Sequence, residues 1–162
     1  MKPLAMHKLD RTALFVLVLF AAGCQGKSPP SAASVDPRMK SVGTVEVTAR
    51  LVEIPEGAIF QRDLYDYATI LKYEVVEVHR GAVEKGATIY VGQYNPWKPR
   101  AEAADKRAKD VGGTLRQFVA GQTHRMALET PIDDFFMGGI VDKYFGKHSG
   151  PSYWAVLTNQ AD

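Results

Sequence analysis

Two long stretches of alternating apolar and polar residues, each of which changes phase along its length, constrain the fold most strongly. In the first, the apolar positions are Val45, Val47, Ala49 and Leu51, and the apolar face then passes to Val52 and Ile54. In the second, residues 67–79, the apolar face shifts by one residue at Val76. Alternation predicts half-buried strands, and a one-residue slip requires a bulge or bend. The chain is therefore expected to form long, bent strands.

The remaining elements are predicted from turn and composition signals. Gly81 and Gly86 mark a turn that leads into a third strand, so the second and third strands should form a hairpin. An alanine-rich, charged helix is predicted over 100–109, with Pro99 near its start and Gly112-Gly113 after its end. The third and later strands are predicted at 88–91, 124–129 and 153–158.

The order of these elements is three strands, one helix and two strands, in a mainly β chain. It resembles an OB-fold, a small five-stranded barrel with a helix between strands 3 and 4. The segments 73–94 and 118–121 look like the netrin/tissue-inhibitor type of OB domain. A β-sandwich would give similar sequence signals and stays open as an alternative.

The N-terminus has the features of an export signal. Lys2, Lys8 and Arg11 precede an apolar run over 13–22, which is too short for a spanning helix of about 20 residues. The run ends in Ala21-Ala22-Gly23-Cys24, which resembles the lipobox of bacterial lipoproteins. The resemblance implies that Cys24 is lipidated and becomes the mature N-terminus. Ordinary secretion, with Cys24 as an incidental residue, is the alternative.

We therefore expect three regions: a signal peptide over 1–23, a lipidated cysteine with a flexible tether over 24–41, and an OB-like domain over 42–162. Ser, Ala, Pro and Gly dominate the tether. The resemblance to lipoproteins, with Gln25 after the cysteine, implies a location at the outer membrane facing the periplasm. The membrane, reached through the lipid on Cys24, is then one partner.

Charge and cysteine content exclude several classes of function. The chain has 20 basic and 18 acidic residues, and removing the leader with Lys2, Lys8, Arg11 and Asp10 leaves 17 of each. A neutral mature chain argues against nucleic acid as a partner. A single cysteine excludes an intrachain disulfide and a thiolate zinc site.

No catalytic motif is found in the sequence, and no cofactor is predicted. Ser149 lacks the G-x-S-x-G spacing of a nucleophile elbow. The residues that could hold a metal are His124, Asp133 and Asp134, although adjacent aspartates more often start a turn or cap a helix. A metal-assisted hydrolase built on these three residues is one alternative function.

Aromatic and basic residues after the third strand are the candidates for ligand binding. They are Tyr94, Trp97, Arg100 and Arg107. The aromatic residues at 135–136, 144–145 and 153–154 either close the ends of the barrel or contact a ligand. We expect a membrane-anchored, non-catalytic adaptor that binds an envelope protein or glycan. An inhibitor or assembly factor that acts by strand addition is a further alternative.

Overall fold

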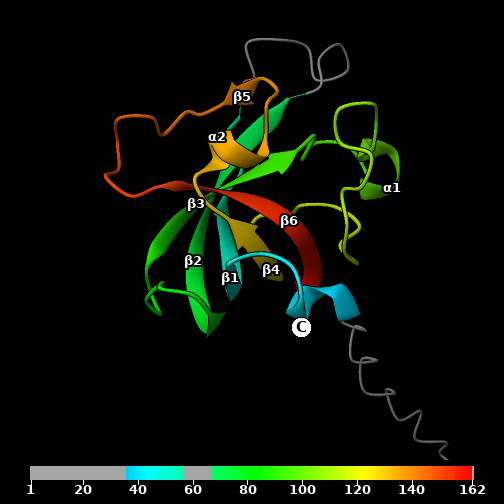
Figure 1. Cartoon of the computed structure of the whole chain (residues 1–162). Coiled ribbons are helices and arrows are strands. Elements are labelled where there is room, and N and C mark those ends of the chain that lie inside the picture. The colour runs from blue at the N-terminus through cyan, green and yellow to red at the C-terminus, as the bar shows by residue number, and fades with distance from the viewer. Residues whose placement is uncertain (1–35, 57–66, 162) are drawn as a thin grey trace, which may run out of the picture.

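The computed structural model describes residues 36–56 and 67–161, in which β-strands dominate (Figure 1). The expected signal peptide, Cys24 and the tether up to residue 35 lie outside the described residues. In chain order the described elements are η1 (Pro37–Lys40), β1 (Val45–Glu53), β2 (Ala68–Arg80), β3 (Thr88–Tyr94), α1 (Arg100–Ala103), β4 (Thr123–Glu129), α2 (Ile132–Phe135), β5 (Ile140–Val141) and β6 (Ser152–Ala161).

Five of the strands close into a barrel. The sheet order is β1-β4-β6-β3-β2, and β1 also pairs with β2, so the ring is complete. All pairs in the ring are antiparallel except β3 and β6, which run parallel. The prediction of a small OB-like barrel is confirmed, and the open sandwich is excluded by the pairing of β1 with β2.

The predicted phase changes are bulges in the pairing of β1 with β2. Ala49 lies opposite Val75, but the next pair joins Thr48 to Glu77, so Val76 is skipped. Val76 is 42% exposed, whereas Val75 is buried. Because a bulge turns the following side chains to the other face, β2 can bend around the barrel while Val78, beyond the bulge, still packs against the core and Val76 faces outward.

The short strand β5 and the short helix α2 form a second layer that the sequence did not predict. β5 pairs in parallel with the start of β2, at Ala68 and Thr69. Ile132 of α2 packs over Gly92 of β3. A Cβ atom on Gly92 would lie only 2.3 Å from Cδ1 of Ile132. The described residues therefore form one apolar cluster inside the ring and one between its outer face and the segment that carries α2 and β5. A smaller third cluster joins Met39 of η1 to Ala127 and Leu157.

The helix predicted over 100–109 lies between β3 and β4 as expected, but it ends at Ala103. Ala104 is extended, with ψ 135°. The Asp105 carboxylate accepts from the backbone N–H of Arg107 at 2.7 Å and of Ala108 at 3.2 Å. These are N–H groups that a continuing helix would direct to its own carbonyls, so the aspartate turn replaces the helix.

Gly112-Gly113 does not end that helix, as the sequence suggested, but lies against β6. We call residues 112–115 the strap. Leu115 N–H donates to Thr158 at 3.2 Å, and Thr158 N–H donates to Gly112 at 3.4 Å. β3 and β6 pair over three residues each, so the strap supplies partners for the part of β6 that β3 does not reach.

The folded body extends beyond Val42 on the N-terminal side, into the expected tether. Asp36 caps η1 by accepting from Arg38 N–H at 2.9 Å, and Met39 is fully buried. The guanidinium of Arg80 donates to the carbonyls of Lys40, at 3.0 Å, and of Val42, at 2.5 Å. These contacts attach η1 to the end of β2.

Replacing Gly113 by alanine tests the strap. Gly113 has φ +99°, and a Cβ there would lie 2.1 Å from the Thr158 carbonyl oxygen. We expect Gly113→Ala to lower the free energy of unfolding by about 3 kcal/mol or more in urea denaturation. Gly121→Ala is the matched control, because Gly121 has φ +91° and open space around it, so it should cost about 1–2 kcal/mol. Equal losses in the two variants would show that the strap is not tightly docked.

Candidate functional site

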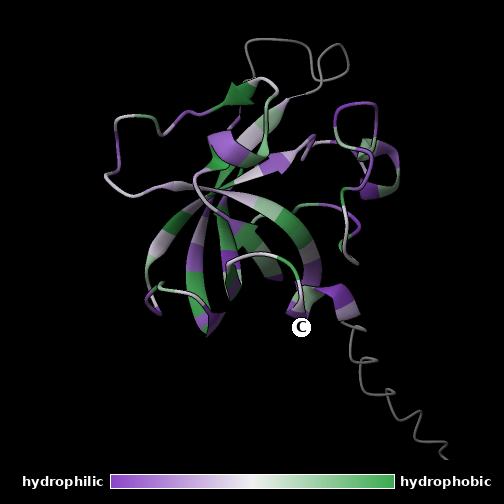
Figure 2. Ribbon diagram, in the orientation of Figure 1, coloured by the Kyte–Doolittle hydropathy of each residue, from purple (hydrophilic) through white to green (hydrophobic). Residues whose placement is uncertain are grey.

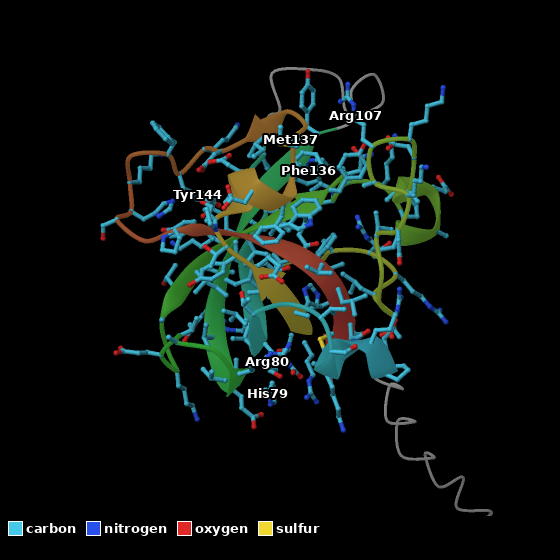
Figure 3. The ribbon with its side chains drawn as sticks, in the orientation of Figure 1. His79, Arg80, Arg107, Phe136, Met137 and Tyr144 are labelled. Carbon is cyan, nitrogen blue, oxygen red and sulfur yellow. The ribbon has the colours of Figure 1, made fainter. Side chains whose placement is uncertain are left out.

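The four residues predicted to bind a ligand have different environments. Tyr94 is 2% exposed, its hydroxyl donates to Asp105, and its ring packs against Phe136 with centroids 5.6 Å apart. Trp97 is partly buried in the loop after β3, and Arg107 is exposed. Tyr94 is thus a packing residue of the outer layer, while Arg107 lies at the end of the body near Met137 (Figure 3).

Arg100 is half-buried at the start of α1. Its Nη1 donates to the carbonyls of Tyr94, at 2.7 Å, and Asn95, at 3.3 Å. Its guanidinium carbon lies 5.0 Å from the centroid of the Phe118 ring. Burial lowers the pKa of Arg100 to about 10, and no carboxylate of the described residues pairs with it. Arg100 therefore has a structural role in holding the loop after β3, and retains an uncompensated positive charge.

The aromatic residues of the covering segment divide into buried and exposed members. Phe136 is buried and stacks on Trp154 with centroids 4.7 Å apart, and Tyr144 is buried beside Tyr90. Their sequence neighbours point outward: Phe135 is 46% exposed, Met137 93% and Phe145 86%. The segment therefore closes the barrel and also presents apolar side chains to solvent.

Phe135 and Met137, which we call the apolar loop, border a pocket of about 540 Å³. The pocket is lined by Tyr67, Arg107 and the residues from Phe135 to Gly139. Figure 3 shows Arg107, Phe136 and Met137 at the end of the body that is remote from His79 and Arg80. An aromatic ring, a flexible thioether and a guanidinium beside one pocket are the side chains that dominate protein-binding surfaces.

His124, predicted as a possible metal ligand, lies inside the barrel. Its Nδ1 is 3.0 Å from the hydroxyl of Tyr73, and its ring meets Phe118 edge-on. Its Nε2 is buried and has no hydrogen-bond partner among the described residues. Burial lowers the pKa of His124 to about 4 and raises the pKa of Tyr73, so both are neutral near pH 7.

Asp133 and Asp134 lie on α2, outside the barrel, and both are exposed. The structure does not bring them together with His124, which is enclosed by the ring of strands. Across residues 36–56 and 67–161, no group of three or more His, Cys, Asp or Glu side chains is close enough to hold a metal ion. The convergence that a metal-assisted hydrolase requires is not found in these ranges.

Strand addition would need a long uncovered edge. The ring is closed, the strap covers β6, and β5 covers the start of β2, so the described residues offer no such edge except on the two-residue strand β5 itself. The geometry gives this alternative no particular support.

Two polar features could not be identified from the sequence. Glu46 alternates with Val45 and Val47 and was expected to face solvent, but it is buried and accepts from Arg125 at 2.6 Å. Arg80 approaches the same carboxylate at 3.3 Å. Inside the barrel, Gln93 donates to Thr158 at 3.1 Å. Each pairing joins residues far apart in the chain, and no local signal marks it.

The buried imidazole gives a prediction for pH. The pKa of His124 is lower in the folded than in the unfolded chain, so the unfolded chain takes up the proton first as pH falls. The free energy of unfolding should be highest above about pH 6.5 and fall by roughly 3 kcal/mol by about pH 4. Urea unfolding measured across this range should show a smaller loss in His124→Asn, which cannot titrate. Tyr73→Phe should keep the pH-dependent loss of stability, because the lowered pKa of His124 is caused by burial. A Tyr73→Phe variant without this loss would contradict the account.

No helix in the described part of the chain has the length and hydropathy needed to span a membrane. Comparison with protein families, with curated proteins and with solved structures finds no match for this chain. A function for the protein is therefore inferred from the geometry of its own residues.

Proposed function

We propose that this chain is a lipid-anchored protein of the bacterial envelope whose OB-like barrel docks another envelope protein and catalyses no reaction itself. The observation that carries the proposal is the apolar loop, with Met137 93% exposed beside a pocket and Arg107. Large apolar side chains exposed together beside a pocket are typical of interaction sites.

The chemistry of the apolar loop favours a protein partner over a glycan. Phe135 and Met137 offer apolar area, and the flexible thioether adapts to irregular protein surfaces. Tyr94 and Trp154, whose rings could stack on sugars, are packed against Phe136 in the outer layer, and Trp97 is partly buried. Gly138 and Gly139 follow the loop directly, so the backbone there has few side chains to restrict it.

The orientation of the body supports the same proposal. The described chain begins at η1, at one end of the body, whereas α2 and β5 lie at the opposite end (Figure 1). A lipid on Cys24 would attach the body to the membrane from its η1 end and leave the apolar loop at the far end. Three acyl groups, as implied by the resemblance to bacterial lipoproteins, are sufficient for durable anchoring.

Non-catalytic docking also fits the positions of the reactive side chains. His124 is enclosed in the barrel and Asp133 and Asp134 are exposed on its outside, so the candidate acid–base groups are separated by the barrel wall. The apolar loop does not depend on any of these groups.

Replacing the apolar loop tests docking. We expect the double variant Phe135→Ser, Met137→Ser to lose partners that the wild type retains after crosslinking in intact cells and purification from envelopes. Both side chains are exposed, so the fold should be unaffected in circular dichroism. The control is Val76→Ser, which removes from the barrel wall an apolar side chain that is exposed about as much as Phe135. Recovery of the same partners by the double variant would refute a role for this surface.

Replacing Cys24 tests the anchor. Cys24→Ser removes the thiolate that would carry the lipid, and we expect the variant to move from the membrane to the soluble periplasmic fraction. Intact mass spectrometry of the wild type should show the added acyl groups. Membrane fractionation of Cys24→Ser equal to that of the wild type, with no acyl mass on the wild type, would contradict lipidation.

A further inference from the structure

A second pocket, of about 580 Å³, lies between α1, η1 and the strap. Arg100 of α1, Arg38 of η1 and Arg116, which follows the strap, contribute to its lining, together with Asp110. None of these residues belongs to the apolar loop or to its pocket. Three cations and one carboxylate give the lining an excess of positive charge.

The charge balance identifies which cations are uncompensated. Arg38 pairs with Asp36 at 2.8 Å and with Asp110 at 2.7 Å, so one guanidinium is shared by two carboxylates. Arg100 and Arg116 form no ion pair with any carboxylate of residues 36–56 and 67–161. These two arginines therefore lack a protein counter-charge of their own, and the charged groups at the pocket remain positive in sum.

The guanidinium of Arg100 has hydrogen-bonding capacity that the described protein does not use. Nη1 donates to the carbonyls of Tyr94 and Asn95, whereas Nε and Nη2 have no acceptor among the described residues. Burial against Phe118 lowers the pKa of this group to about 10. A half-buried cation without a counter-charge is costly to keep, and such groups concentrate at binding sites.

We propose that this pocket binds a phosphate group, held by the guanidinium groups of Arg100 and Arg116. The planar fork of a guanidinium matches phosphate oxygens and binds them through charge-assisted hydrogen bonds. A phosphate group carries more negative charge and more acceptor oxygens than a carboxylate, so it can engage two guanidinium groups at once. The volume accommodates a phosphate and the small group that bears it.

This site is independent of the proposed docking function, because it uses other residues. It lies beside η1, where the chain leaves for the expected membrane anchor, so the phosphate could belong to a lipid headgroup or to a free metabolite. Both share the chemistry that the two arginines recognise.

The test uses the full chain carrying Cys24→Ser, with inorganic phosphate as the probe at constant ionic strength and pH 7.5. We expect saturable binding in isothermal titration calorimetry, and weaker binding of acetate. Arg116 is exposed and its side chain makes no contact that holds the fold. Arg116→Gln should therefore weaken phosphate binding about tenfold without lowering the melting temperature. The control is Lys106→Gln, which removes an exposed cation of the same segment outside the pocket.

Arg100→Lys gives a second, independent variant. It keeps the positive charge but loses the fork, so phosphate binding should weaken even where the barrel remains folded in circular dichroism. No saturable binding of phosphate, or equal weakening in Arg116→Gln and Lys106→Gln, would overturn the proposal.

Vesicles distinguish the two sources of phosphate. Binding to vesicles that contain phosphatidic acid, in excess of binding to phosphatidylglycerol vesicles of equal charge density, would identify a lipid phosphomonoester. Binding of soluble phosphate without that excess would identify a free phosphate compound.

Discussion

The pairing of β1 on both of its edges is the constraint on which the rest of the structure depends. β1 joins β4 through a regular antiparallel register and joins β2 through a register that shifts three times. Only a strand that bends can pair with both neighbours in a ring this small. The bulges supply that bend, so the same slips that are visible in the sequence make closure possible. Figure 2 shows apolar and polar residues alternating along the strands, as expected where one face of each strand lines the closed barrel.

Closure of the barrel also determines whether a polar side chain lies inside the ring or on its outer face. Tyr73, Gln93 and His124 are buried inside the ring, where Tyr73 bonds to His124 and Gln93 bonds to Thr158, and burial disfavours the charged forms of Tyr73 and His124. Glu46 lies on the outer face, where Arg125 and Arg80 flank its carboxylate. Polar groups of the strands thus meet neutral or charged partners according to the face on which closure places them.

The strands of the barrel can be predicted from the sequence because the patterns that mark them involve residues close together in the chain. The alternation from Val45 to Leu51, the slip at Val76 and the glycine turn before Thr88 each report the structure of their own neighbourhood. The helix over 100–109 failed because Asp105 forms a side-chain turn, which outweighs the helix propensity of the alanines. At the candidate site, the aromatic segments were noticed, but the sequence could not separate Phe136, which stacks on Trp154, from the exposed Phe135 and Met137. That separation depends on contacts across the fold.

The two surfaces with unused binding capacity differ in how they relate to the tether. The apolar loop lies at the end of the body remote from η1 (Figure 1), so the proposed docking surface is separate from the N-terminal end of the described residues. The arginine pocket includes Arg38, a residue of η1, and Arg38 links Asp36 to Asp110, which also accepts from Gly112 N–H of the strap at 2.8 Å. Arg38 thus joins η1 to the strap through Asp110, in addition to the contacts that Arg80 makes with η1. The arginine pocket therefore lies where η1, α1 and the strap meet, whereas the apolar loop is formed by a separate segment of the chain.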